Sequence, residues 1–127
     1  MRPYQLSGAW IIDDTYNGNI EGMKAGLALL KDLEAKRKIY VTPGLVDQGA
    51  EEKRVHRELG EAIADASPDK VILMRHSVTP FILDGLRDFK GELIVEDDPL
   101  DFYANLDKFV AAGDLVLMQN DWPDNYN

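Results

Sequence analysis

The most informative stretch of the sequence is Ile11-Ile12-Asp13-Asp14-Thr15-Tyr16-Asn17-Gly18-Asn19. Two apolar residues run into two adjacent carboxylates, a short turn-forming run follows, and a helical pattern begins at Ile20. An open α/β sheet places its ligand-handling groups at such a junction, just beyond the carboxyl end of a strand. Two neighbouring carboxylates repel each other, so both stay ionised most easily with a cation, water or hydroxyl groups nearby. The stretch therefore predicts a strand, a polar ligand loop and a helix, in that order.

A simpler interpretation is that the polar residues of this stretch only cap the helix. Aspartate and asparagine side chains accept hydrogen bonds from the first-turn amides of helices, so Asp13, Asp14 and Asn19 all suit that role. Capping accounts for one of them, but not for four polar groups and a tyrosine together.

The rest of the chain alternates apolar runs with apolar residues at helical spacing. The pattern predicts strands at 9–13, 38–42, 70–75, 92–96 and 114–118. It predicts helices at 21–36, 50–66 and 79–89, and a fourth that is capped by Asp97 or Asp98, has Pro99 in its first turn and ends at Gly113. Five strands alternating with four helices predict a three-layer, Rossmann-like α/β fold, with a mostly parallel sheet and helices on both faces. The first eight residues and the tail after Gln119 fall outside this scheme.

Length and composition favour one α/β domain that spans residues 1–127 and is large enough to bury a core. The chain has no cysteine, which excludes disulfides, zinc thiolates and thiol catalysis. A formal net charge of −9 disfavours nucleic acid or an anionic membrane as the main partner. No apolar run is long enough to span a bilayer, and no signal-peptide pattern is present, so we expect a cytoplasmic protein.

Several motifs of well-known chemistry are missing. The sequence contains no phosphate-binding P-loop, no GxGxxG after the first predicted strand and no clustered histidine metal site. His56 falls on the flank of the apolar side of the helix at 50–66, where we expect a structural role. A phosphoacceptor receiver domain needs an aspartate after its third strand and a lysine after its fifth. The corresponding positions here are Arg75-His76 and Gln119, which excludes that class.

The motif at 13–19 resembles the Asp-Asp-Ser/Thr-Tyr-Asn-Ala-Asn-Pro motif that opens the C-terminal domain of Mur ligases. The similarity is greatest to the members that add D-alanyl-D-alanine to the cell-wall nucleotide precursor. Three later segments resemble the family's Met-Leu-Glu-Leu-Gly, His-Arg-Glu-Val-Gly and Gly-Asp-x-Val-Leu, in the same order: Leu45-Val46-Asp47-Gln48-Gly49, His56-Arg57-Glu58-Leu59-Gly60 and Gly113-Asp114-Leu115-Val116-Leu117. Together the matches cover nearly the whole chain.

The chain also departs from the family pattern. Ile20 replaces the proline of the first motif, and Pro43-Gly44 stands where the family has Gly-Asp. The family's Lys-Gly-Ser-Arg after the last strand is Gln119-Asn120-Asp121-Trp122 in this chain. That segment helps to form the substrate end of the site in the family, so the identity of the added amino acid or dipeptide stays open.

The resemblance implies the third domain of a three-domain, ATP-dependent amide ligase of peptidoglycan precursor synthesis. In the family, the N-terminal domain holds the UDP-sugar peptide precursor, and the central domain carries the P-loop and Mg²⁺. The C-terminal domain closes over ATP and binds the incoming amino acid or dipeptide. The two other domains are not in this chain, so we expect the isolated domain to be inactive.

Residue roles follow from the resemblance by position. Asp14 corresponds to the aspartate that contacts the ATP ribose, Asn17 lies where related ligases place a residue near the phosphates, and Tyr16 is a candidate for packing beside the nucleotide. No residue is assigned a catalytic or metal-ligating role.

Three further residues are candidates for the amine substrate: Asn19, Asp47 and Asp121. We expect the tail at 120–126 to fold against the carboxyl ends of the strands and form part of the wall around this substrate. The alternative is that Trp122 only covers an apolar edge of the sheet.

Two function classes remain open at this stage. The first is the ligase domain, and the second is a stand-alone, non-catalytic binding or regulatory module with the same fold. The changed segment at 119–122 favours the module, whereas the intact motif at 13–19 favours the ligase more strongly.

Overall fold

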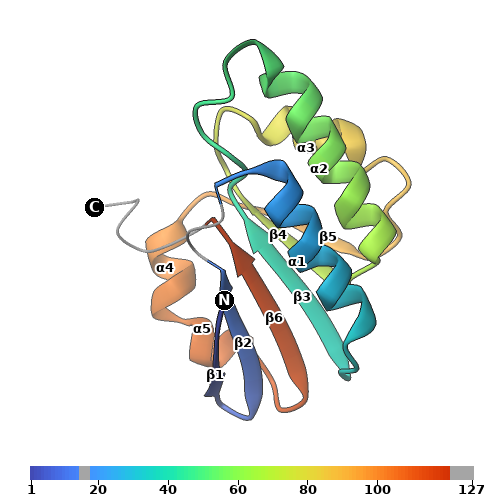
Figure 1. Cartoon of the computed structure of the whole chain (residues 1–127). Helices are drawn as coiled ribbons and strands as arrows, with labels where there is room; N and C mark the ends of the chain where they lie inside the picture. The colour runs from blue at the N-terminus through green and yellow to red at the C-terminus, as the bar shows by residue number, and fades with distance from the viewer. Residues whose placement is uncertain (15–17, 121–127) are drawn as a thin grey trace.

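The computed structural model describes residues 1–14 and 18–120. In this part of the chain one six-stranded sheet runs through the molecule in the order β1-β2-β6-β3-β4-β5 (Figure 1). The strands are β1 (Arg2–Leu6), β2 (Ala9–Asp14), β3 (Arg37–Thr42), β4 (Lys70–Met74), β5 (Glu92–Glu96) and β6 (Asp114–Gln119). All neighbouring strands are parallel except β1 and β2, which are antiparallel.

The first strand, β1, is a correction to the predicted five-stranded scheme. It pairs with β2 from Arg2 opposite Asp13 to Leu6 opposite Ala9. The connection is the two-residue turn Ser7-Gly8, in which both residues have positive φ, at 51° and 82°. Such a turn suits the twist of a hairpin, and glycine adopts it without strain. The strand lacks an apolar pattern because it lies at the edge of the sheet and is mostly exposed.

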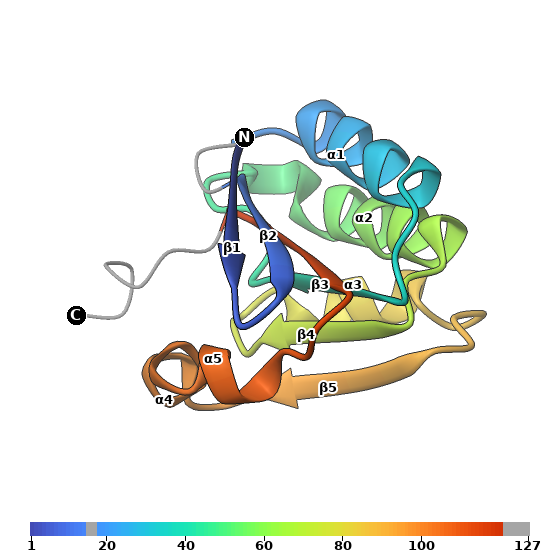
Figure 2. The ribbon, with the colours of Figure 1, turned by 90° about the horizontal axis from the view of Figure 1, so that it is seen from below.

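The helices lie on both faces of the sheet, as Figure 2 shows. One face carries α1 (Ile20–Asp32), α2 (Glu52–Ala66) with the short 3₁₀ turn η1 (Gly49–Glu51) before it, and α3 (Thr79–Gly85). The other face carries α4 (Pro99–Ala104) and α5 (Leu106–Phe109). The predicted three-layer α/β fold with a mostly parallel sheet is therefore confirmed. None of the helices in the described residues has the length and apolar character needed to cross a membrane.

Some predicted helix ends were wrong. The first helix stops at Asp32 instead of residue 36, because Leu33 is already extended and the chain turns toward β3. The third helix stops at Gly85 instead of residue 89. The last predicted helix is divided in two at Asn105, whose side-chain amide bonds the backbone oxygen of Asp101. Capping by Asp98, ahead of Pro99, is confirmed, since its Oδ1 accepts from the amide of Asp101.

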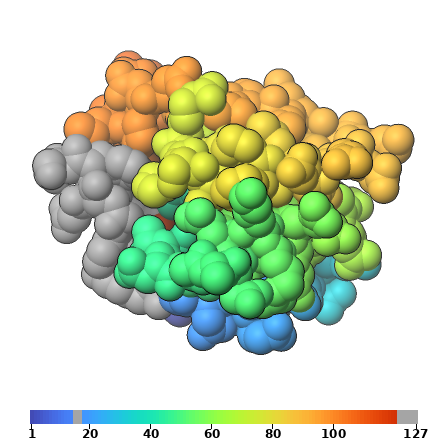
Figure 3. All heavy atoms as spheres, turned by 90° about the horizontal axis from the view of Figure 1, so that it is seen from above, coloured from blue at the N-terminus to red at the C-terminus, as the bar shows by residue number. Residues whose placement is uncertain are grey.

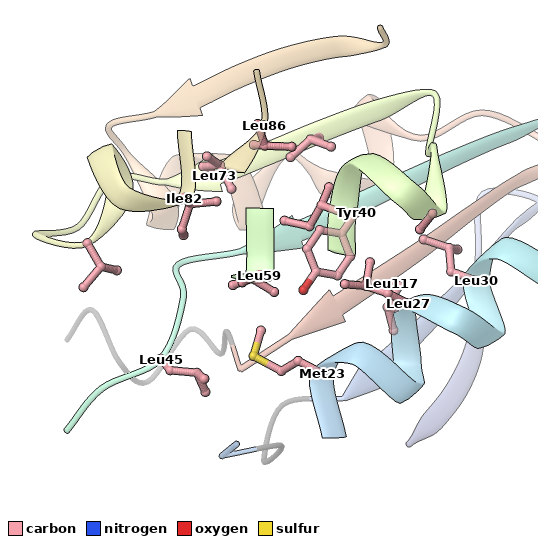
Figure 4. Packing of buried hydrophobic residues seen from close by; sticks show 14 of the residues in the cluster. Met23, Leu27, Leu30, Tyr40, Leu45, Leu59, Leu73, Ile82, Leu86 and Leu117 are labelled. Carbon is pink, nitrogen blue, oxygen red and sulfur yellow. The ribbon is translucent and has the colours of Figure 1, made fainter. Parts of the chain in front are cut away.

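Two apolar clusters flank the sheet. The larger one lies under α1, α2 and α3, and Figure 4 shows the ring of Tyr40 inside it among leucines from helices and strands. The smaller cluster lies under α4 and α5. Each fully buried large apolar side chain contributes about 1.5–3 kcal/mol relative to exposure, so these clusters hold the strand ends in fixed positions.

Helices α2 and α3 come into backbone contact where two glycines meet. A Cβ added at Gly60 would lie 2.2 Å from the carbonyl oxygen of Ile82, and one added at Gly85 would lie 2.1 Å from the carbonyl oxygen of Arg57. Neither position has room for a side chain unless the helices move apart.

We therefore expect Gly60→Ala to lower the free energy of unfolding by about 1–3 kcal/mol, because forced overpacking exceeds the gain of about 1 kcal/mol from helix propensity. Gly18→Ala is the matched control, since no heavy atom lies within 4 Å of its added Cβ. It should change stability by less than about 0.5 kcal/mol. Urea unfolding followed by circular dichroism measures both, and equal effects would contradict the packing argument.

Candidate functional site

The carboxyl ends of three adjacent parallel strands meet at one end of the sheet. Asp14 is the last residue of β2, Gln119 is the last residue of β6, and Thr42 is the last residue of β3. Asp14 pairs with Gln119 in the β2–β6 register. Figure 3 looks onto this end of the molecule, where the start of α2 lies between α1 and α3. Open α/β sheets bind their ligands at this edge, which makes it the candidate site.

A chain of buried hydrogen bonds crosses the site. The hydroxyl of Tyr40 donates to Oε1 of Gln119 at 2.7 Å, and Nε2 of Gln119 donates to Oδ2 of Asp14 at 2.9 Å. Tyr40 and Gln119 are fully buried, and Asp14 is 8% exposed. Burial raises the pKa of Tyr40 far above its usual value, so its hydroxyl stays a neutral donor. This chain of hydrogen bonds therefore ends on the carboxylate of Asp14.

The absence of a side chain at Gly26 of α1 makes room for this arrangement. A Cβ at that position would lie 2.1 Å from Nε2 of Gln119 and 3.4 Å from Oδ2 of Asp14. The backbone of α1 thus forms one wall of the space that holds the amide and the carboxylate.

Asn120 links the segments that follow β2 and β3. Its backbone amide donates to the carbonyl oxygen of Asp14 at 3.1 Å, and its side-chain amide donates to the carbonyl oxygen of Gly44 at 2.7 Å. The hydroxyl of Thr42 donates to the carbonyl oxygen of Gln119 and accepts from the amide of Gly44. The loop after β3 is therefore attached to the end of β6.

His56 holds the same loop from the side of α2. Its Nε2 accepts from the backbone amide of Leu45 at 2.9 Å, and its Nδ1 lies 2.7 Å from the carbonyl oxygen of Glu52. Because a carbonyl oxygen can only accept, Nδ1 is the ring nitrogen that donates in this arrangement. The imidazole is fully buried, so the expected structural role of His56 is confirmed.

The polar residues singled out in the sequence lie in different surroundings in the structure. Asp14 lies in the buried hydrogen-bond chain, while Asp13 pairs with Arg2 at 2.8 Å. The capping interpretation holds for Asn19, since its Oδ1 accepts from the amide of Gly22 at 2.7 Å. Asp47 lies on the exposed loop after β3 and has a φ of 59°.

Three of the predicted site residues, Tyr16, Asn17 and Asp121, lie outside the described residues, and so does the tail after Asn120. Tyr40 and Gln119, which the structure brings into a hydrogen-bond chain with Asp14, were not predicted from the sequence. Their signal is faint: Tyr40 is a polar group within a predicted strand, and Gln119 directly follows the predicted strand at 114–118. Among the residues that the structure describes, no group of three or more His, Cys, Asp or Glu side chains could hold a metal ion.

Comparisons with known proteins identify the class to which this fold and site belong. Residues 1–119 match the family described as Mur ligase, glutamate ligase domain, and the chain belongs to that family. Among curated relatives, the UDP-N-acetylmuramoyl-tripeptide–D-alanyl-D-alanine ligase of Bacillus subtilis (strain 168) is 30% identical over 118 residues, which cover 89% of this chain and 25% of the relative. The ligase of the same name from Rickettsia prowazekii (strain Madrid E) is 35% identical over 79 residues, or 62% of this chain and 17% of the relative.

Solved structures agree with this assignment. The MurF ligase from Thermotoga maritima, determined in complex with ADP, matches 93% of this chain with a TM-score of 0.72 and 26% identity, and the match covers 26% of that enzyme. A domain from a Haemophilus ducreyi protein matches with a TM-score of 0.60 at 15% identity, over 93% of this chain and 85% of that one, which shows a shared fold alone. The predicted resemblance to the D-alanyl-D-alanine-adding Mur ligases is confirmed. The Bacillus subtilis and Thermotoga maritima ligases match most of this chain, but the chain spans only about a quarter of their length.

We expect His56→Ala to lower the free energy of unfolding by about 2–4 kcal/mol, because it leaves the amide of Leu45 without its acceptor and opens a cavity. His76→Ala is the matched control: this histidine is exposed and should tolerate the change within about 0.5 kcal/mol. Chemical denaturation at pH 7 compares the two variants. Wild-type stability in His56→Ala would show that the imidazole does not hold the loop.

Proposed function

We propose that this chain acts as the C-terminal domain of an ATP-dependent amide ligase of peptidoglycan precursor synthesis, closing over ATP and binding the incoming amino acid or dipeptide. The observation that carries the proposal is the carboxylate of Asp14, held by Gln119 at the carboxyl edge of the sheet. Membership of the Mur ligase family and the likeness to an ADP-bound ligase support it. The stand-alone module gains no support, because both curated relatives described above are named as ligases.

The nucleotide role belongs to the last residue of β2 and the segment that follows it. Asp14 accepts hydrogen bonds from the ribose hydroxyls, Asn17 lies near the phosphates, and Tyr16 packs beside the nucleotide. A carboxylate has two oxygens and accepts two hydroxyl hydrogen bonds well, which gives the choice of aspartate its physical reason. Mg²⁺ and the phosphate-binding loop come from the central domain, in keeping with the lack of a P-loop in this sequence.

The amine substrate is bound on the side of the loop after β3. Asp47 is exposed there, and an ammonium group or polar nucleophile needs an acceptor of this kind. Asn19 at the start of α1 and Asp121 after β6 complete the proposed substrate contacts. The hydrogen bonds from Asn120 to Asp14 and Gly44 join the nucleotide side of the site to the amine side.

The reaction itself takes place between the domains. The γ-phosphoryl group of ATP passes to the carboxylate of the UDP-sugar peptide precursor, giving an acyl phosphate and ADP. The amine nitrogen attacks the acyl carbon, phosphate leaves, and the nitrogen loses a proton to give the amide. This domain contributes binding and orientation, which convert a bimolecular attack into one within a single complex.

The purified 127-residue chain should therefore hydrolyse no ATP. Its sequence lacks a P-loop, and its described residues hold no acidic or histidine cluster for Mg²⁺. Phosphate release in the presence of ATP and Mg²⁺ tests this expectation. Phosphate release that exceeds a protein-free blank, and that disappears in the Asp14→Ala variant, would contradict this expectation.

In the complete ligase, Asp14→Ala should raise the KM for ATP about 10- to 150-fold and leave the KM for the amine substrate nearly unchanged. The factor corresponds to about 1.5–3 kcal/mol for lost hydrogen bonds to a charged group. Asp13→Ala is the control, because Asp13 pairs with Arg2 instead of lying in the buried chain, and it should act on stability only. Unchanged ATP kinetics in a folded Asp14→Ala enzyme would count against the nucleotide role.

A further inference from the structure

We propose that Gln119 is a positioning residue that fixes the carboxylate of Asp14 for its contact with the nucleotide, and that Tyr40 in turn fixes the amide of Gln119. This inference rests on the function proposed above. It concerns two side chains that touch no substrate themselves and act only through Asp14.

The chemistry of the groups sets the direction of the hydrogen-bond chain. An ionised carboxylate only accepts, so the atom of Gln119 that faces Asp14 at 2.9 Å is the amide nitrogen. The amide oxygen then faces Tyr40 at 2.7 Å and needs a donor, which the phenolic hydroxyl supplies. Without Tyr40 the amide would lose this preference for one orientation, and its oxygen could turn toward the carboxylate.

The surroundings leave Gln119 a single position. The side chain is fully buried, and the backbone of Gly26 in α1 closes its space on one side. The hydroxyl of Thr42 holds its backbone oxygen at 2.8 Å. Within residues 1–14 and 18–120, no buried side-chain nitrogen or oxygen lacks a hydrogen-bond partner. Rotating the amide would break its hydrogen bonds to Tyr40 and Asp14 and leave buried polar groups without partners. The free-energy cost of such groups keeps the amide in this orientation.

The choice of an amide also affects the charge of the site. Asp114, the other buried aspartate among the described residues, accepts from the guanidinium of Arg37 at 2.7 Å, which offsets its charge. The side chain that bonds Oδ2 of Asp14 is neutral instead. The amino group of Met1 lies 4.0 Å from Oδ1 of the same carboxylate, at ion-pair distance. The amide of Gln119 orients Asp14 through a neutral hydrogen bond and adds no charge of its own to the site.

Steady-state kinetics of the complete ligase test the inference through two variants. Gln119→Glu keeps the size of the side chain and its acceptor for Tyr40, but it replaces the donor to Asp14 with a second carboxylate. Tyr40→Phe removes only the hydroxyl that orients the amide. We expect the KM for ATP to rise about 3- to 10-fold in both, with the KM for the amine substrate unchanged. Met118→Leu is the control, because Met118 belongs to the apolar cluster under α4 and α5.

Two further readouts separate positioning from a merely structural role. The carboxyl introduced by Gln119→Glu can donate to Asp14 once it is protonated, so the increase in KM should shrink as the pH falls from 8 to 6, relative to wild type. In the Asp14→Ala background, Tyr40→Phe should cause no additional increase, because the group it positions is gone. Folding of each variant is checked by its melting curve, and Tyr40→Phe keeps the test decisive if Gln119→Glu does not fold.

The outcomes distinguish the two proposals. If Asp14→Ala impairs ATP use while Tyr40→Phe, or a folded Gln119→Glu, has wild-type kinetics, the positioning inference is overturned and the nucleotide role of Asp14 stands. An additive effect of Tyr40→Phe in the Asp14→Ala background also overturns it. If Asp14→Ala itself leaves ATP kinetics unchanged, the proposed nucleotide role fails, and the inference falls with it.

Discussion

Strand β6 is inserted between β2 and β3, and this strand order determines where the helices and the candidate site lie. Strands β3, β4 and β5 follow one another outward along the sheet, so right-handed connections place α1, α2 and α3 on the same face. The chain then reverses direction to reach β6, and the same handedness puts α4 and α5 on the opposite face (Figure 2). This reversal brings the last residue of β6 between the ends of β2 and β3. Gln119 thereby comes to lie beside Asp14, although the two are 105 positions apart in the sequence.

The polar groups of the site are held in place by hydrogen bonds to one another. Tyr40, Gln119 and Asp14 form one buried series, and Asn120 attaches it to the loop after β3. A buried polar group without a partner costs about 1–3 kcal/mol, so removing one member also penalises the next. Such a network specifies one arrangement more strictly than apolar packing does. Gly26 completes it by leaving the space that the amide fills.

The sequence predicted the elements that bury apolar faces and missed those that do not. The strand β5 was predicted with its observed bounds, and β2, β3, β4 and β6 were each within one residue at either end, because their apolar runs are nearly unbroken. The edge strand β1 was missed, since it is mostly exposed and its pairing depends on the Ser7-Gly8 turn. The predicted helix ends at 36 and 89 were wrong because apolar residues at helical spacing continue past Asp32 and Gly85, where the helices stop. The sequence predicted a site at the carboxyl edge of the sheet through Asp14, and that stays a prediction. Tyr40 and Gln119 come to lie beside Asp14 through the strand order, which no local pattern encodes.

We propose above that Asp14, fixed by Gln119, receives the nucleotide at the carboxyl edge of the sheet. A crystal structure of the complete ligase in its closed state, with a non-hydrolysable ATP analogue bound, is the decisive test. We expect the ribose hydroxyls within about 2.5–3.0 Å of the Asp14 carboxylate, with Nε2 of Gln119 still bonded to Oδ2. A ribose bound elsewhere, with Asp14 in contact only with protein atoms, would contradict it.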